Sequence, residues 1–131
     1  MSENKRMPIE ATVAELKPGM KSVNITFKVI NISDERSVES RNTNETYRVV
    51  DAMVGDSTGT ILLPLWNEAI DSVEEGETYT LTNGYTGLFK ANLRLQMGKF
   101  GTLASAVEKI EEVNTTLNMS AKDYNNRTRS S

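Results

Sequence analysis

The sequence predicts an all-β domain, and three observations support this prediction. Residues 22–32 alternate apolar and polar side chains and are rich in β-branched residues, which is typical of a long, half-buried strand. Two further extended segments, 46–56 and 60–66, are separated only by a turn around GDSTG, which indicates a hairpin. The chain has 131 residues, of which 37% are hydrophobic and 25% charged, and this length and composition are typical of a domain with one hydrophobic core.

The first part of the chain contains one helical turn before the long strand. Residues 1–10 are polar and are expected to be flexible. The segment 11–20 is typical of a short helical turn that a Pro-Gly pair closes. The strand 22–32 changes its apolar parity near its end, which a β-bulge would explain. Residues 33–45 are polar and predict a long loop, long enough to suggest a function.

The second part of the chain begins with a break in the β pattern. Residues 67–77 predict a short helix with an asparagine cap and a glycine stop. Strands are then expected at 78–89, where two glycines suggest a bend, and at 91–97, where the alternation is clear. The segment 102–110 is ambiguous between helix and strand, and we favour a strand because a hairpin return would close the sheet. Residues 114–131 are polar and unpatterned, which predicts a disordered tail.

This order of elements has one brief helix between the third and fourth strands. It is the order of a five-stranded Greek-key barrel, the OB-fold. A generic small β-barrel is the alternative. The barrel domain is expected to span 11–113, between the flexible residues 1–10 and the disordered residues 114–131.

Composition excludes several classes of function. The chain has no cysteine and no histidine, so thiolate zinc sites, cysteine nucleophiles and imidazole bases cannot occur. We therefore expect no cofactor and no enzymatic activity. No stretch is apolar enough to cross a membrane and the N-terminus lacks an apolar leader, so an intracellular location without membrane contact is expected.

Charge is distributed unevenly along the chain. The formal net charge is −3, which by itself argues against a nucleic-acid partner. The acids are concentrated in 67–77, whereas 84–101 contains bases and no acid. One face could therefore be basic. The acidic segment could form a metal or acid–base site, but a solvated helix face is the favoured interpretation.

The only tryptophan, Trp66, has an unusual orientation in the strand pattern. Because side chains alternate between the two faces of a strand, Ile61, Leu63 and Leu65 share one face and Trp66 lies on the other. We therefore expect Trp66 on the outside of the barrel. The alternative is that it caps the core next to Ile70.

Four motifs follow one another in order: VGDSTG, LWNE, EEGETYTL and NGYTGLFK. Together they resemble the archaeal single-stranded DNA-binding proteins with one OB-fold, relatives of the replication protein A domains. The resemblance extends from about Leu16 to Ala106. It implies a non-enzymatic protein of DNA replication, repair or recombination, which binds single-stranded DNA across an open sheet face. The implied location is the cytoplasm, in association with the nucleoid.

The resemblance also implies which side chains stack on bases. In that family, aromatic residues at the end of the third strand and after the fourth stack on bases, and the matching positions are Trp66, Tyr85 and Phe89. Exposed rings suit a binder that tolerates any sequence, because every base has a π-face. The strand pattern alone leaves Tyr85 equally consistent with core and surface, since only a bulge at Gly84 would turn it outward. The resemblance favours the surface.

Cationic and amide side chains are expected to contact phosphates or base edges beside the rings. Lys28 and Arg94 lie on the polar faces of their strands. The alternative for each candidate is a solvated side chain without a partner, so the prediction depends on a face shared with the rings. The expected contacts are Lys28, Arg48, Lys90, Asn92, Arg94 and Gln96.

Binding of single-stranded DNA with little sequence specificity is the leading functional hypothesis, and replication or repair proteins are possible further partners. Two other classes of function stay open. An RNA-binding OB module is one, since nothing in the sequence reads the 2′-hydroxyl. A protein-interaction OB subunit of a larger complex is the other.

Overall fold

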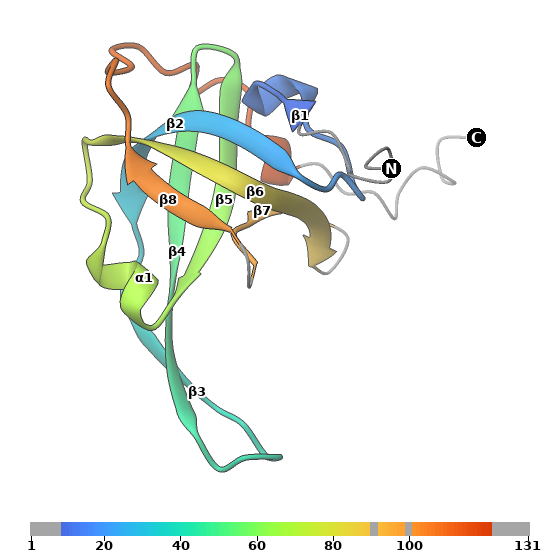
Figure 1. Cartoon of the computed structure of the whole chain (residues 1–131), viewed down its shortest axis with the longest axis vertical. Helices are drawn as coiled ribbons and strands as arrows, with labels where there is room; N and C mark the ends of the chain where they lie inside the picture. Colours follow the sequence, from blue (N-terminus) through green and yellow to red (C-terminus); the bar gives the residue numbers. More distant parts are fainter. Residues whose placement is uncertain (1–8, 90–91, 99–100, 122–131) are drawn as a thin grey trace, which may run out of the picture.

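The computed structural model describes residues 9–89, 92–98 and 101–121 (Figure 1). Within these ranges the chain forms mainly β-strands, with one short α-helix and two 3-10 turns. In chain order the elements are β1 (Ile9–Glu10), η2 (Val13–Glu15), β2 (Val23–Ile32), β3 (Arg36–Glu39), β4 (Thr46–Asp56), β5 (Gly59–Trp66), α1 (Glu68–Asp71), β6 (Thr78–Phe89), β7 (Asn92–Gln96), β8 (Thr102–Ser105) and η3 (Met119–Ala121).

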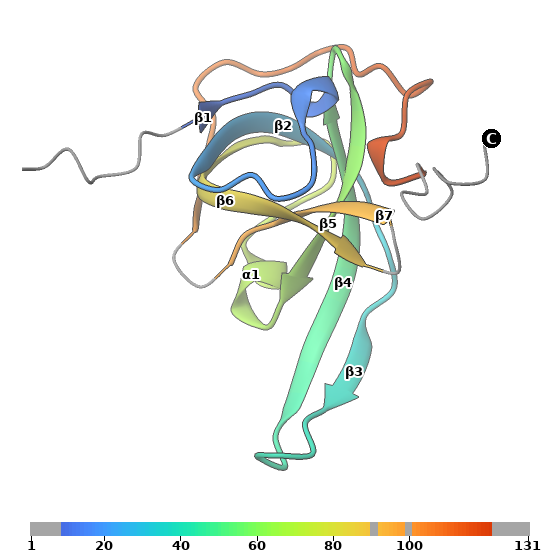
Figure 2. The ribbon, with the colours of Figure 1, turned by 90° about the vertical axis from the view of Figure 1, so that its right-hand side faces the viewer.

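Five strands form the barrel, in the order β2-β4-β5-β7-β6, and β6 pairs back with β2 (Figures 1 and 2). The first part of β6 pairs with β2 and β8, and its last part with β7, so this one long strand closes the sheet. The helix α1 lies between the third and fourth barrel strands, β5 and β6. The predicted Greek-key OB-fold is confirmed, and so is the hairpin of β4 and β5.

Alternation along the strands places the core. The inward residues of β5 and β7 are almost completely buried, and the predicted bulge in β2 occurs between Val29 and Asn31. Each buried aliphatic side chain of this kind stabilises the fold by about 1.5–3 kcal/mol. The largest fully buried side chains include Phe27, Leu16, Ile61, Leu63, Leu65, Leu81, Leu93 and Leu95.

The turn between β4 and β5 forms hydrogen bonds with η2, near the N-terminus. The buried carboxylate of Asp56 accepts hydrogen bonds from the backbone N–H groups of Val13 (3.0 Å) and Thr58 (2.8 Å). The Thr58 hydroxyl accepts a third from the N–H of Ala14, at 3.0 Å. A Cβ at Gly55 would lie 2.6 Å from the Gly59 carbonyl oxygen, so this position requires glycine. The GDSTG motif is therefore structural here.

Residues 33–45 are not simply a loop, and this part of the prediction is wrong. Strand β3 pairs with the first part of β4, and the two form an arm that projects from the barrel (Figures 1 and 2). Both faces of such an arm contact water, so its residues need no apolar alternation, and the sequence pattern that marks a strand is absent. Val38, the one aliphatic residue of β3, is exposed.

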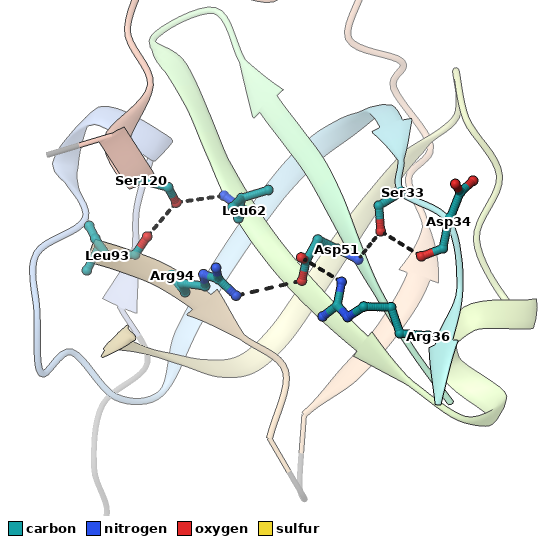
Figure 3. Close-up of polar contacts among 8 residues, drawn as sticks. All are labelled: Ser33, Asp34, Arg36, Asp51, Leu62, Leu93, Arg94 and Ser120. Atoms are coloured by element: carbon teal, nitrogen blue, oxygen red, sulfur yellow. Dashed lines mark hydrogen bonds and ion pairs between the residues drawn. The ribbon is translucent and has the colours of Figure 1, made fainter. Parts of the chain in front are cut away.

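The prediction of a disordered tail from residue 114 is wrong for residues 114–121. The Leu117 carbonyl accepts a hydrogen bond from the N–H of Thr60 (2.8 Å), and Met119 is buried. The Ser120 hydroxyl accepts one from the N–H of Leu62 (2.9 Å) and donates one to the carbonyl of Leu93 (Figure 3). β5 and β7 run parallel, and Ser120 bridges backbone groups of the two strands.

Ordered structure begins before the N-terminal boundary of the predicted domain. Ile9 and Glu10 form β1, which pairs in parallel with β2, so flexibility of residues 1–10 is wrong for these two. Residues 1–8 and 122–131 lie outside the described residues. The ambiguous segment 102–110 contains the expected strand, β8, which ends at Ser105.

Candidate nucleic-acid interface

One outer face of the barrel crosses β4, β5, β7 and β6. Cross-strand partners in a sheet point to the same side, so the register determines which residues share this face. Trp66 on β5 lies opposite Val49 on β4, and Leu62 lies opposite Arg94 on β7. Three further pairs on this face join β7 to β6: Gln96 with Tyr85, Arg94 with Gly87, and Asn92 with Phe89.

Trp66 is the last residue of β5 and is 46% exposed, so the expected outward orientation is confirmed. Immediately after it, Asn67 adopts a positive φ of 52° and turns the chain into α1. The expected side-chain cap of this helix is absent, because the Asn67 Oδ1 instead accepts a hydrogen bond from the Arg48 N–H at 3.0 Å.

Tyr85 faces outward because β6 contains an extra residue. Val23 and Ile25 of β2 pair with Gly84 and Leu81 of β6, so three steps along β6 match two along β2. Asn83 takes a positive φ of 62° at this point, and the alternation of faces reverses after it. Tyr85 is consequently 41% exposed, and the outward turn that required a bulge at Gly84 is confirmed.

Trp66 and Tyr85 both line a hollow of about 550 Å³. Pro64 and Gln96 also line it, together with side chains from α1 and from the end of β7. The hollow is bordered by two partly exposed rings, the Gln96 amide, the polar side chains of Glu68 and Ser72, and apolar surface. A flat, partly apolar molecule with polar edges matches this lining.

Phe89, at the end of β6, is half exposed and lies over a cation. The guanidinium carbon of Arg94 is 4.6 Å from the centre of the Phe89 ring. The same guanidinium approaches the carboxylate of Asp51 at 3.6 Å, and Arg36 binds the other oxygen of that carboxylate at 3.2 Å (Figure 3). Arg94 and Arg36 thus flank one acid on the ring-bearing face.

Two of the expected cationic contacts do not share the ring-bearing face, although Arg48 lies next to it, because its guanidinium donates to the carbonyl of Asn67 at 2.9 Å. Arg48 alternates with Tyr47 on β4, and it pairs with Asp71 (3.0 Å) and Glu35 (3.5 Å). The hydrogen bond to Asp71 raises the pKa of Arg48 above its ordinary value. Lys28 lines a separate hollow with Glu111 and other residues of the C-terminal segment, and none of the three ring residues lines it.

Four expected contacts remain, of which three lie on the ring-bearing face and one lies outside the described residues. Asn92, Arg94 and Gln96 share the face with the rings. Lys90 lies outside the described residues. The structure therefore brings together the three rings and three of the six expected polar contacts.

Sequence reasoning missed Tyr47 and Arg36. The Tyr47 ring lies 6.4 Å from the Trp66 ring, centre to centre, with the planes at 79°, an edge-to-face arrangement. Tyr47 lies two residues before Val49 on β4, so the two side chains point to the same face. The sequence could have placed Tyr47 near Trp66 only if the pairing of Val49 with Trp66 had been known. Arg36 stood in a segment expected to be a loop, so the sequence offered no signal for it.

The acidic segment 67–77 forms no visible metal site. Among the described residues, no group of three or more acidic side chains is arranged to hold a metal ion. Two of the acids of α1, Glu68 and Asp71, are exposed, as expected for a solvated helix face.

No helix within the described ranges is long and apolar enough to cross a membrane.

Comparison with known proteins agrees with the topology and the motifs. Residues 16–105 match the family described as "Single-stranded DNA binding protein Ssb-like, OB fold". The chain belongs to this family. The resemblance inferred from the four motifs is therefore confirmed. The name of this family describes DNA binding and not catalysis, which agrees with the prediction that the protein is not an enzyme.

Individual relatives of this Ssb-like chain come from different organisms. It is 36% identical over 100 residues to the single-stranded DNA binding protein Ssb of Saccharolobus solfataricus, a match that covers 76% of this chain and 66% of that protein, just under two thirds of its length. The solution structure of a hypothetical protein from Arabidopsis thaliana has a TM-score of 0.75 and 31% identity, and the match covers 92% and 88% of the two chains. The second OB-fold domain of replication protein A from Methanococcus maripaludis shares the fold, with a TM-score of 0.61 and 20% identity over 79% of this chain and all of that one.

Proposed function

We propose that the chain binds single-stranded DNA with little sequence specificity, by stacking bases on Trp66, Tyr85 and Phe89, and that it acts in replication, repair or recombination. The observation that carries the proposal is the placement of three partly exposed rings, from two strands of the barrel, on one outer face. Membership of the Ssb-like family supports single-stranded DNA as the ligand.

Stacking supplies most of the expected affinity. Each base stacked on an aromatic ring contributes about 1–3 kcal/mol by truncation, so three rings contribute about 3–9 kcal/mol before the costs of ordering the strand. Trp66 and Tyr85 line the same hollow, so we expect neighbouring bases of one strand to stack on these two rings. Extrusion of bases from a duplex costs unstacking energy, so an unpaired strand is the preferred ligand.

Phosphate contacts contribute less. On the ring-bearing face, Asp51 partly neutralises Arg36 and Arg94. Each phosphate that a protein neutralises on a single strand contributes about −0.7 to the slope of log affinity against log salt concentration. We therefore expect a shallow slope, equivalent to about one or two phosphates.

Fluorescence titration tests the proposal directly. Trp66 is the only tryptophan, so its emission reports on this face alone. Addition of poly(dT) should quench it, and an unlabelled duplex of equal length should compete weakly. Binding by anisotropy without quenching would move the site away from Trp66, and an absence of binding would refute the proposal. Competition by an RNA strand of equal length would show whether RNA is an equivalent ligand.

A further inference from the structure

We propose that Arg94 is a positioning residue for Phe89, and that it does not bind a phosphate. In this arrangement Asp51 holds the Arg94 guanidinium against the barrel, and the guanidinium supports the Phe89 ring on which a base stacks. The inference rests on the proposed function, because it assigns a task to one residue of that same binding face.

The register shows why the ring and the guanidinium meet. Arg94 lies directly opposite Gly87 on the neighbouring strand β6, and Phe89 follows two positions later on the same face. A Cβ built at Gly87 would meet no atom of the described residues within 4 Å, so the space beside Arg94 is open on that strand. The Phe89 ring lies over the guanidinium, with 4.6 Å between the ring centre and the guanidinium carbon. Cation–π attraction favours this stack.

The burial of Arg94 differs from that of a phosphate ligand. Its side chain is only 18% exposed. Its Nε is buried and has no hydrogen-bond partner among the described residues. A residue that binds phosphates presents its N–H groups to the solvent, where the strand arrives. Arg94 has its planar group largely covered, which suits support of a ring from beneath.

Asp51 is the ion-pair partner of the guanidinium, at a distance longer than a hydrogen bond, and its Oδ1 is buried without a hydrogen-bond partner among the described residues. Its carboxylate lies 3.6 Å from Arg94 Nη1 on one side and 3.2 Å from Arg36 Nη1 on the other. The backbone of Asp51 is itself anchored, because its N–H donates to the Ser33 hydroxyl at 2.9 Å (Figure 3). A carboxylate in the middle of a DNA-binding face would repel phosphates. Its presence there is explained if it holds Arg94 in place.

A double-mutant cycle separates the two roles of Arg94. Binding of a fluorescein-labelled dT oligonucleotide is measured by anisotropy for the wild type, Arg94→Met, Phe89→Leu and the double variant, each at several salt concentrations. We expect Arg94→Met to weaken binding about 3- to 10-fold in the wild-type background and hardly at all in the Phe89→Leu background. The salt slope should not change.

A matched cycle with Trp66→Leu is the control, since Trp66 does not contact Arg94 in the described structure. There the effects of Arg94→Met and Trp66→Leu should multiply. A loss from Arg94→Met that is the same with and without Phe89, together with a slope smaller by about 0.7, would identify Arg94 as a phosphate ligand and overturn the inference. Binding by the wild type would still support the proposed function in that case.

The variant Asp51→Asn tests whether Asp51 affects binding through its charge alone or by holding Arg94 beneath Phe89. If charge alone matters, removal of this acid should strengthen DNA binding. If Asp51 holds Arg94 beneath Phe89, affinity should fall about 2- to 5-fold despite the gain of positive charge. Glu39→Gln, which removes an acid from the arm away from Arg94, is the control for charge and should strengthen binding slightly.

Arg94→Lys covers the case in which Arg94→Met does not fold. Lysine keeps the charge and loses the plane that stacks on the ring. A phosphate ligand would tolerate this change, whereas a support for Phe89 would not, so affinity near the wild-type value would contradict the inference. Thermal unfolding of each variant shows that the barrel is intact.

Discussion

On strand β5, the inward residues Ile61, Leu63 and Leu65 are at most 1% exposed, whereas Trp66, on the outward side, is 46% exposed. All four side chains are apolar, and Leu65 and Trp66 are adjacent residues of the same strand. The inward set contributes stability because it leaves water when the chain folds. The outward tryptophan retains exposed apolar surface in the folded protein, and that surface is available for a ligand. Stability and binding should therefore be separable along a single strand.

The largest effect is expected on the inward side, from Leu63→Ala. Loss of a fully buried leucine leaves a cavity and should lower the free energy of unfolding by about 2–5 kcal/mol. Urea denaturation measures this change. At low temperature, where the variant is still folded, its affinity for single-stranded DNA should equal that of the wild type, and a large loss of affinity would show that the two faces are coupled.

Trp66→Leu should have the opposite effect. Removal of the stacking ring should weaken single-strand binding about 5- to 150-fold, which corresponds to the energy of one stacked base. Because the side chain is half exposed, its urea midpoint should lie close to that of the wild type. Anisotropy with a labelled oligonucleotide measures the first change. A variant with full affinity would exclude Trp66 from the site.

A smaller effect is expected from Tyr47→Leu. The edge of one ring contacts the face of the other in the pair of Tyr47 and Trp66, and such pairs contribute about 0.5–1.5 kcal/mol. Without this contact the tryptophan should be less ordered and single-strand affinity should fall about 2- to 10-fold. In a Trp66→Leu background the same substitution should change affinity little. An equal loss in both backgrounds would mean that Tyr47 contacts the strand itself.

The smallest effect is expected from Arg48→Gln. The Arg48 guanidinium is paired with Asp71 and Glu35 on the side of β4 opposite Tyr47. We expect the affinity and the salt slope of single-strand binding to be unchanged, because no phosphate contact is lost. A decrease of the slope by about 0.7 would return Arg48 to the binding site.

Much of the fold could be predicted because it depends on local alternation. The inward residues of β5 and β7 and the break at α1 follow from patterns of a few residues, and the outward orientation of Trp66 follows from the same parity. Strand β3 could not be predicted, since a strand with water on both faces has no pattern. The packing of residues 114–121 could not be predicted either, because Ser120 binds backbone groups of distant strands, and a backbone group carries no sequence signal.

The candidate site could likewise be predicted only in part. The residues of the three rings and of Arg94 could be selected from the sequence, on parity and on the resemblance to a family. Their partners could not: Asp51 meets Arg94 only because β4, β5 and β7 are neighbours in the sheet, although the two residues are far apart in the chain.

The sequence by itself determined which side chains face inward, where the chain turns and which rings are available, since these depend on the two-residue period of a strand. Only the tertiary structure decided that β6 carries a bulge that exposes Tyr85, that Arg48 is paired with acids, that Lys28 lies beside the C-terminal segment, and that Arg94 lies beneath Phe89. The physical reason is that strand register and sheet order, which bring together residues distant in the chain, are set by the closure of the whole barrel.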